Sequence, residues 1–402
     1  MSAPRPLRVA HLTTTHDAFD ARVFLKECRT LAAAGCEVTL CVPHDRDETR
    51  DGVRVRAVPH PAGRAARATV GAWRVFRAAL ASGADVLHTH DPELLPYALL
   101  AKLMGRRAVH DVHENLPKDV RSKHYLPAWL RGALAACVDV LERAACACLD
   151  AVIVATPGIA PRFAGPRTHL VRNVPLLSEF PATGATPFAE RAPVAVYLGG
   201  LNGIRGLREM TRAAALAATA RFTLAGRFDP PALEREIAAE PGWARVTALP
   251  WRSRAEVAAL LADARAGLLV LHPVPNHLDS LPVKMFEYMA AGLPVIASDF
   301  PVWREAMGEA AVYVDPFDPP AIARAADALV ADPAAAQRRG ALGRAAIERE
   351  YSWERESREL LACYAQLARA AGCAEPRAFS GGGAGAGPGA DRTSPEARPP
   401  AC

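Results

Sequence analysis

The chain has 402 residues, of which 50% are apolar and 23% are charged, and its formal net charge is +5. This composition excludes a fibrous or largely disordered protein, and the length favours two sizeable globular domains. The positive charge is smaller than dedicated nucleic-acid-binding proteins carry, so we expect no nucleic-acid partner.

In the first part of the chain, short strand-like runs alternate with longer helical patterns. The runs predict strands at 7–12, 37–42, 85–88, 107–110 and 151–155, and helices at 20–34, 92–104 and 127–149. Strands that alternate with helices are typical of a parallel, doubly wound sheet. We therefore expect a Rossmann-like domain over residues 1–176.

The pattern breaks at 177–192, where Pro181, Gly184 and Pro187 predict a linker. It then restarts, with strands expected at 194–198, 222–225, 246–249, 267–271, 294–298 and 311–314 and helices at 206–219, 255–264, 282–291, 319–329 and 334–350. We expect a second Rossmann-like domain at 193–352. A last helix, 353–371, is expected to pack back toward the first domain, and the Gly/Pro-rich residues 376–402 to be disordered.

Cysteine usage and hydropathy bear on the location of the protein. The nine cysteines are an odd number without a disulfide framework, so we expect reduced thiols in a cytoplasmic protein. The N-terminal apolar stretch is too short for a signal peptide, and charged residues interrupt the apolar region 133–156. No membrane span is predicted.

Polar residues and glycines follow the predicted strands in both halves of the chain. Ligands of open parallel sheets bind beyond the carboxyl ends of the strands, near helix N-termini. The two edges are expected to face each other across an interdomain cleft. The residues at these edges are Thr13–His16, His88–Asp91, Asp111–Glu114, Gly199–Gly206, Arg227, Trp251 and His272–Ser280.

Two segments of the second half suit an anion. The glycine-rich turn from Gly199 to Gly206 carries Arg205 at the start of a helix, where backbone amides and the helix dipole favour a diphosphate. A glycine-rich turn is also a common structural joint, so the turn alone does not decide between the two interpretations.

The run 279–292 is a sharper candidate. It predicts a helix with Asp279 or Ser280 as N-cap, and Lys284 and Glu287 on one face of it. A cation with free amides suits phosphate oxygens, and a carboxylate one turn later can accept two ribose hydroxyl hydrogens. The alternative is a solvent-exposed Lys–Glu pair of about 0.3 kcal/mol.

These segments resemble the family-4 retaining glycosyltransferases of GT-B fold. The stretch 272–299 is similar to the donor-binding signature of that family, and 197–207 to its Gly-Arg-Leu…Lys-Gly loop. Residues 17–27, Asp111-Val-His113-Glu114 and 351–354 resemble further family motifs. The resemblance runs in order through nearly all of residues 7–371.

The resemblance implies transfer of a sugar from a nucleotide-diphosphate sugar with retained anomeric configuration and without a metal or other cofactor. It implies that Arg205, Lys284 and the amides around Ser280 and Leu281 bind the diphosphate, with Gly199 in the loop. Glu287 would bind the ribose and Asp279 the sugar. Trp251 would lie at the nucleobase, or be a core aromatic. His113 would lie near the reacting carbon, or would only cap the next helix or hydrogen-bond a backbone carbonyl.

The chain departs from the family pattern at three places. The first of the two family Glu residues is Asp279, the Arg of the Gly-Arg-Leu loop is Gly200, and the usual Gly-Gly acceptor loop is replaced by Thr13–His16. The diphosphate is therefore expected to depend more on Arg205 and Lys284.

Further residues are assigned to the acceptor side, namely His16, Asp20, Arg22, His90 and Asp111. Asp20 could equally cap the helix that it begins. His88 and His90 share one face of a strand end and resemble a metal pair, but without a clear third ligand we expect cleft-lining polar residues and no metal.

We expect a glycosyltransferase of surface polysaccharide or glycolipid biosynthesis, acting on a saccharide or lipid-linked acceptor. The rival interpretations are a nucleotide-sugar epimerase of the same fold and a non-catalytic nucleotide-sugar-binding module. A segment with basic and aromatic residues suits peripheral contact with anionic lipid at the inner face of the membrane, or is an ordinary solvated loop. Its residues are Lys118, Arg121, Lys123, His124, Tyr125, Trp129 and Arg131.

Overall fold

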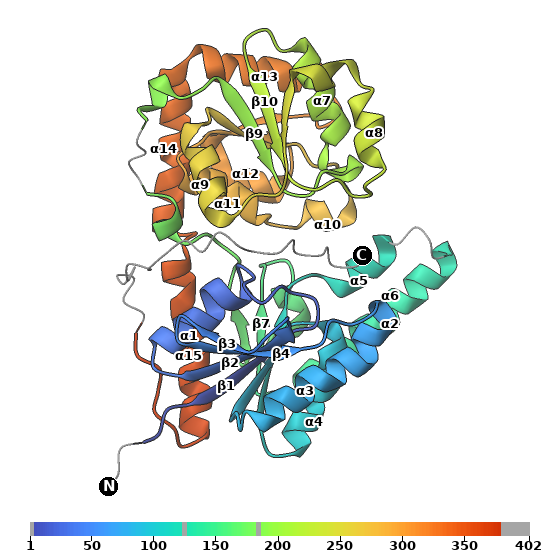
Figure 1. The fold of residues 1–402 in the computed structure, drawn as a ribbon, viewed down its shortest axis with the longest axis vertical. Coiled ribbons are helices and arrows are strands. Elements are labelled where there is room, and N and C mark those ends of the chain that lie inside the picture. The colour runs from blue at the N-terminus through green and yellow to red at the C-terminus, as the bar shows by residue number, and fades with distance from the viewer. Residues whose placement is uncertain (1–3, 123–126, 182–185, 379–402) are drawn as a thin grey trace. The chain divides into compact units, whose positions relative to one another are not determined.

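The computed structural model describes residues 4–122, 127–181 and 186–378 and divides the chain into two compact units. The first unit comprises Met1–Asn173 and Glu354–Cys402, and the second comprises Val174–Trp353. Each unit is an α/β domain built on one sheet (Figure 1). The residues expected to be disordered, from 379 onward, and Lys123, His124 and Tyr125 lie outside the described part of the chain.

The first unit contains an eight-stranded sheet of order β3-β4-β2-β1-β5-β6-β7-β8. Its strands are β1 (Arg8–Leu12), β2 (Glu37–Pro43), β3 (Glu48–Arg50), β4 (Val53–Val58), β5 (Val86–Thr89), β6 (Arg107–Val112), β7 (Ala151–Val154) and β8 (Thr168–Leu170). All pairs are parallel except β3 with β4. The chain winds from β1 toward β4 and then from β5 toward β8, so the direction reverses between β1 and β5.

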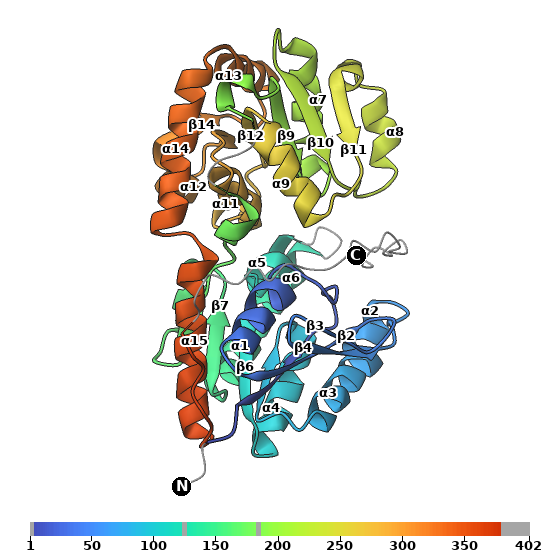
Figure 2. The ribbon, with the colours of Figure 1, turned by 60° about the vertical axis from the view of Figure 1, so that its left-hand side comes forward.

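Helices cover both faces of this sheet, so its central strands are buried nearly throughout, polar residues such as His11 and His88 included. The helical segments are η1 (Val23–Cys28), α1 (Arg29–Ala33), α2 (Arg64–Ala66), η2 (Arg67–Gly71), α3 (Ala72–Ala81), η3 (Pro92–Leu94), α4 (Leu95–Leu103), α5 (Leu116–Ser122), α6 (Ala128–Ala147), η4 (Ala160–Phe163) and α15 (Trp353–Ala370). Figure 2 shows α15 beside β7. Arg172 donates to the Glu356 carboxylate of α15 at 2.7 Å, which ties this last helix to the first unit.

The second unit contains a six-stranded parallel sheet of order β11-β10-β9-β12-β13-β14. Its strands are β9 (Val194–Leu198), β10 (Arg221–Ala225), β11 (Val246–Leu249), β12 (Ala266–Leu269), β13 (Val295–Ser298) and β14 (Ala311–Val314). Here the winding direction reverses between β9 and β12.

The helical segments of the second unit are η5 (Leu177–Glu179), η6 (Phe188–Glu190), η7 (Gly203–Arg205), α7 (Leu207–Leu216), α8 (Leu233–Ala238), η8 (Pro241–Arg245), α9 (Arg254–Asp263), α10 (Pro275–Leu278), α11 (Val283–Ala290), α12 (Pro301–Met307), η9 (Gly308–Ala310), α13 (Pro319–Ala331) and α14 (Pro333–Arg349). The core is centred on large buried rings, among them Tyr197, Phe222, Phe286 and Trp303. Within the described ranges of the whole chain, no helix combines the length and hydropathy that a membrane span requires.

Two differences from the sequence prediction have clear causes. The predicted linker 177–192 belongs to the second unit, because Phe180 and Phe188 are buried in its core. Strands β3 and β4 were not predicted; they form an edge hairpin whose turn is Asp51-Gly52, with φ of 50° and 78°. Burial in β4 alternates between valine and arginine, which hides it from a search for apolar runs.

Candidate functional site

The loops at the reversal point of the second sheet form the candidate donor site. Gly199 follows β9 directly, and the loop to α11 begins at His272, beyond β12. Parallel strands that neighbour each other bring these two loops to the same sheet edge. Open α/β sheets bind ligands at such a reversal, so the topology supports the location that the sequence predicts.

The conformation of the Gly199–Gly206 loop depends on two of its glycines. Gly199 has φ +128°, and Gly206 has φ +75° with the Val270 carbonyl oxygen only 2.2 Å from where a Cβ would lie. A side chain at either position would be strained. Asn202 caps the short turn η7 by accepting from the Arg205 amide at 3.1 Å. The loop therefore holds Arg205 in place at the start of α7.

Two cations from separate elements reach this loop. A Cβ at Gly199 would lie 2.7 Å from Lys284 Nζ, and a Cβ at Gly200 would lie 2.8 Å from Arg205 Nη1. Lys284 belongs to α11 and Arg205 to η7, so tertiary structure brings the two charges together. The absence of side chains at Gly199 and Gly200 leaves the backbone exposed to both cations.

Tyr197 at the end of β9 holds Lys284 in position. The Lys284 ammonium donates to the Tyr197 hydroxyl at 3.0 Å and lies 4.3 Å from its ring centroid. The same hydroxyl donates to the Gly200 carbonyl at 3.0 Å. Burial, reinforced by the charge of Arg205, lowers the pKa of Lys284 to about 7. An anion at the loop would reverse this shift by compensating both charges.

The start of α11 differs from the prediction. Pro282 is its N-cap, without a side-chain cap bond, so the expectation that Asp279 or Ser280 caps the helix was wrong. Asp279 instead ends the four-residue helix α10 and is exposed, and Ser280 donates its hydroxyl to the His277 carbonyl at 3.3 Å. Trp303 fixes this turn by donating its indole hydrogen to the Ser280 carbonyl at 2.8 Å. Leu281 is half-buried beside it.

Glu287 is buried, and its Oε1 accepts from Arg254 Nη1 at 2.5 Å. Arg254 also donates to Glu179 Oε2 at 2.6 Å, so one guanidinium joins two carboxylates. The solvent-exposed Lys–Glu pair that the sequence left open is therefore wrong for Glu287. Sequence reasoning missed Arg254, although its place at the first position of α9, after the Ser253 N-cap, marks it as a residue near a strand's carboxyl end.

Trp251 lies beyond the carboxyl end of β11 and is 62% exposed. The alternative of a core aromatic is therefore wrong. The Arg227 guanidinium, which follows the neighbouring strand β10, lies 5.9 Å from the Trp251 ring centroid. An exposed indole beside a cation offers a planar surface on which a base can stack.

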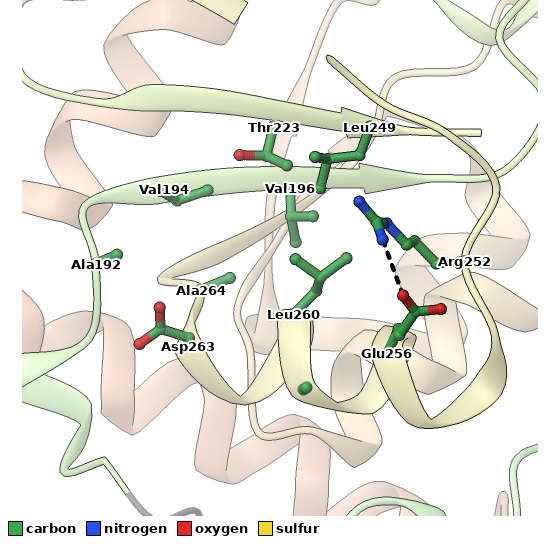
Figure 3. Close-up of a pocket in the computed structure, with 11 residues that line it drawn as sticks. Ala192, Val194, Val196, Thr223, Leu249, Arg252, Glu256, Leu260, Asp263 and Ala264 are labelled. Atoms are coloured by element: carbon green, nitrogen blue, oxygen red, sulfur yellow. Dashed lines mark hydrogen bonds and ion pairs between the residues drawn. The ribbon is translucent and has the colours of Figure 1, made fainter. Parts of the chain in front are cut away.

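A hollow of about 380 Å³ lies elsewhere in this unit, between α9 and the sheet (Figure 3). Apolar side chains line most of it, including Val194, Val196, Leu249 and Leu260. Arg252 and Glu256, at one end, pair with each other at 2.8 Å. Because this hollow holds neither Arg205 nor Lys284, we place the donor site at the Gly199 loop instead.

In the first unit, His16 and His113 form the accessible edge of a polar cluster at the β1/β5 reversal. Their side chains are 23% and 19% exposed, and their ring centroids are 5.0 Å apart. Neither predicted alternative for His113, a helix cap or a carbonyl partner, describes its contacts. His113 Nε2 lies 3.0 Å from Asp111 Oδ2 and 3.2 Å from His90 Nδ1.

Behind this edge lie three residues that the sequence assigned to the acceptor side. Arg22, His90 and Asp111 are each at most 3% exposed, so they lie beneath the accessible edge. Arg22 donates from Nε and Nη2 to the two Asp111 oxygens, both at 2.9 Å. Although burial opposes ionisation, this pair holds the pKa of Asp111 well below its usual range. These residues orient His113 rather than reach solvent.

Asp20 caps the helix that follows it. Its Oδ1 accepts from the amides of Arg22 at 2.8 Å and Val23 at 2.9 Å, which agrees with the capping alternative. Asp91, whose role the sequence left open, organises the threonine loop. Its carboxylate accepts from Thr13 Oγ1 at 2.9 Å and from the Thr14 amide at 2.6 Å, and it is also bonded to the Thr15 hydroxyl.

His88 and His90 are buried, not cleft-lining as the sequence suggested. Two further side chains of a type that can bind a metal lie beside them, namely His11 on β1 and Glu27 on η1. Both come from segments that are distant along the chain, so the sequence offered only the alternation of His88 and His90 as a signal.

Comparisons with known proteins agree with this architecture. The family model described as "Glycosyl transferase 4-like domain" matches residues 21–176, and that described as "Glycosyl transferases group 1" matches residues 192–332. The first match lies mainly in the first unit and the second lies within the second unit. Among curated proteins, no sequence matches the chain.

Solved structures share the fold at low sequence identity. Sucrose-phosphate synthase from Thermosynechococcus elongatus is 20% identical with a TM-score of 0.71, covering 91% of this chain and all of that one (100%). HepE of Anabaena, in complex with UDP and glucose, is 14% identical with a TM-score of 0.66 over 88% of this chain and 98% of its own.

A trehalose-phosphate synthase from Burkholderia xenovorans, in complex with glucose-6-phosphate, is 15% identical with a TM-score of 0.62 over 89% of this chain and 99% of its own. The family-model matches together span most of the chain, in the order of the two units. The chain therefore belongs to the glycosyltransferases of GT-B fold, with a glycosyl transferase 4-like domain followed by a group 1 glycosyltransferase domain.

Proposed function

We propose that this enzyme transfers a glycosyl group from a nucleotide-diphosphate sugar to a saccharide or lipid-linked acceptor, with retention of anomeric configuration and no metal in the reaction. The observation that carries the proposal is the convergence of Arg205 and Lys284 on the bare backbone of Gly199 and Gly200. Two cations at the reversal point of a parallel sheet suit a diphosphate.

The two cations would act on the leaving group. As the bond between sugar and diphosphate breaks, negative charge grows on the phosphate oxygens while the sugar becomes oxocarbenium-like. Charges fixed in advance stabilise this change without reorganisation. The hydrogen bond from Lys284 to the Tyr197 hydroxyl holds the Lys284 ammonium in position. In a front-face reaction the departing phosphate can take the acceptor's proton, so no protein base is required.

The remainder of the donor has matching groups. Glu287 uses Oε1 for Arg254, and its second oxygen can accept ribose hydroxyl hydrogens. Trp251 offers its exposed face to the base. Asp279 would contact the transferred sugar; its exposure at the end of α10 is consistent with such a contact. The acceptor would meet His16 and His113, the accessible residues of the first unit's cluster.

The solved relatives suggest which ligands to try first. HepE was solved with UDP and glucose, and the trehalose-phosphate synthase with glucose-6-phosphate. Uridine diphosphate sugars are therefore the first donors, and sugar phosphates join saccharides and lipid-linked sugars among the acceptors. A role in surface polysaccharide or glycolipid synthesis fits the last two classes.

A membrane-bound acceptor would suit helix α6. Trp129, Val140 and Leu141 on this helix are 77%, 64% and 63% exposed. With Lys118, Arg121 and Arg131 nearby in sequence, the helix supports peripheral binding to anionic lipid at the inner face of the membrane. Co-sedimentation with anionic but not neutral vesicles is expected, and no binding to either at low salt would contradict it.

The deciding experiment is a panel of nucleotide-diphosphate sugars, first for thermal stabilisation and then for turnover read by mass spectrometry. Product that appears only with both donor and acceptor, with the anomer retained by NMR, is expected. An epimerised donor without acceptor would instead favour the epimerase. Stabilisation without turnover on any acceptor would favour a binding module. The Lys284→Ala variant should lose donor use, and unchanged kinetics would contradict the site.

A further inference from the structure

Four ligand-type side chains meet inside the first unit, beneath the accessible edge formed by His16 and His113. His11 lies on β1, His88 and His90 lie on β5, and Glu27 lies on η1. His11 and His88 are direct neighbours across the parallel β1/β5 pair, and His90 follows two residues later on the same face. All four side chains are at most 3% exposed. We call these four residues the buried histidine cluster.

Their ligand atoms surround one point. One atom from each residue lies within 4.8 Å of the other three. His11 Nδ1 and His90 Nε2 are hydrogen-bonded to each other at 2.9 Å. Glu27 Oε2 is 4.0 Å from His11 Nδ1, 3.9 Å from His88 Nδ1 and 4.0 Å from His90 Nε2. Tetrahedral ligands about 2.0–2.2 Å from a zinc ion are roughly 3.4 Å apart. The separations in the cluster bracket that value.

Unsatisfied polar atoms are a second, independent indication. Both oxygens of Glu27, together with Nε2 of His11 and Nε2 of His88, are enclosed and have no hydrogen-bond partner in the part of the chain that the structure describes. Arg22 Nε lies 3.1 Å from Glu27 Oε1 without hydrogen-bond geometry, since that guanidinium donates to Asp111 and to the Val171 carbonyl. A buried carboxylate without hydrogen bonds is rare unless it is protonated or binds a cation.

We propose that His11, Glu27, His88 and His90 bind one divalent transition-metal ion, with zinc as the best match. Three imidazole nitrogens and one carboxylate oxygen are ligands that zinc accepts, while calcium and magnesium prefer sets made of oxygen alone. The full enclosure of the site leaves no position open to a substrate. The ion is thus structural: it joins β1, β5 and η1 and takes no part in glycosyl transfer.

Outer contacts fit the same assignment. Metal-bound histidines usually direct their other nitrogen to a carboxylate or another acceptor. His90 Nδ1 faces Asp111 Oδ2 at 3.6 Å and His113 Nε2 at 3.2 Å, which leaves His90 Nε2 for the ion. His88 Nδ1, its nitrogen nearest to Glu27, lies 2.9 Å from the Tyr364 hydroxyl of α15. The ion would therefore hold the His90 ring in place, and His90 in turn positions His113 through their 3.2 Å contact. A second possible group, His90 with Asp111 and His113, is less suitable because Arg22 already holds Asp111.

The test begins with the full chain, produced with a purification tag that binds no metal. We expect about one zinc per chain by elemental mass spectrometry after dialysis. After removal of the ion by a chelator, added Zn²⁺ should raise the melting temperature, and added Co²⁺ should give the visible bands of a four-coordinate ion. Paramagnetic NMR of the cobalt form should show three imidazole ligands.

Variants then assign the site. Glu27→Gln and His88→Gln preserve volume and should reduce the metal content from about one to under about a tenth of an equivalent. His110→Gln is the matched control, because His110 on β6 is equally buried but bonds to Thr89 outside the cluster. A folded native chain that binds neither Zn²⁺ nor Co²⁺ would overturn the proposal. So would metal content that is unchanged in Glu27→Gln and His88→Gln, or a cobalt form with fewer than three imidazoles.

Discussion

The pKa of Lys284 makes donor binding depend on pH in a defined direction. Burial and Arg205 lower this pKa to about 7 in the free enzyme, so near neutral pH about half of the molecules carry a neutral amine. A bound diphosphate favours the ammonium and raises the pKa again. Binding therefore takes up a proton, and affinity must fall as pH rises through the pKa of the free enzyme.

The size of the effect follows from this linkage. If the bound ammonium keeps its proton to about pH 9 or above, the apparent Kd for a nucleoside diphosphate rises about 50-fold from about pH 7 to about pH 9. The phosphate itself titrates near pH 6 and gains charge with rising pH, so it would strengthen binding. The two contributions have opposite signs and can be told apart.

Isothermal titration calorimetry provides the assay. Titrating UDP at about pH 7 in two buffers of different ionisation enthalpy should show an uptake of roughly half a proton. Lys284→Arg keeps a permanent charge and should remove both the uptake and the fall in affinity, because the arginine pKa lies far above this range. Lys284→Met should bind weakly at every pH. A native profile that parallels that of Lys284→Arg would refute the reasoning.

Three further variants test the donor site. Arg254→Ala removes the partner of Glu287 and should raise the KM for donor about 10-fold with little change in kcat, since one charge-assisted hydrogen bond contributes about 1.5–3 kcal/mol. Gly200→Ala would place a Cβ 2.8 Å from a guanidinium nitrogen and should weaken UDP binding in calorimetry, whereas Gly203→Ala meets nothing within 4 Å. Trp251→Ala should cost about 1–3 kcal/mol of UDP binding free energy without lowering the melting temperature, because the ring is exposed.

Matched controls keep these outcomes interpretable. Arg252→Ala, close to Arg254 in sequence, removes a pair with Glu256 that is partly exposed and should leave the KM unchanged. If Arg254→Ala behaves like this control, Glu287 does not depend on its guanidinium. Equal UDP affinity in the two glycine variants would contradict the position of the cations, and unaltered affinity in Trp251→Ala would place the base elsewhere.

Local sequence patterns determined most of the fold and part of the donor site. The strands β9, β11 and β14 occur at their predicted residues, because an apolar run between turn residues is a local signal. The same holds for the glycine loop before Arg205 and for the charges of α11. These features are encoded within a few turns of chain, so no knowledge of the sheet order is needed to find them.

Only the tertiary structure decided which side chains became partners. Arg254 and Glu287 lie on different helices, and nothing in either segment indicates their 2.5 Å pair. His11 lies beside His88 because β5 is the second neighbour of β1 in the sheet, next to β2 on its other side. This strand order depends on the packing of the whole sheet. Asp111 and His90 are likewise held by Arg22 and His11, which come from segments distant along the chain. Residue type and spacing specify local geometry, whereas contacts between distant segments depend on the packing free energy of the complete domain.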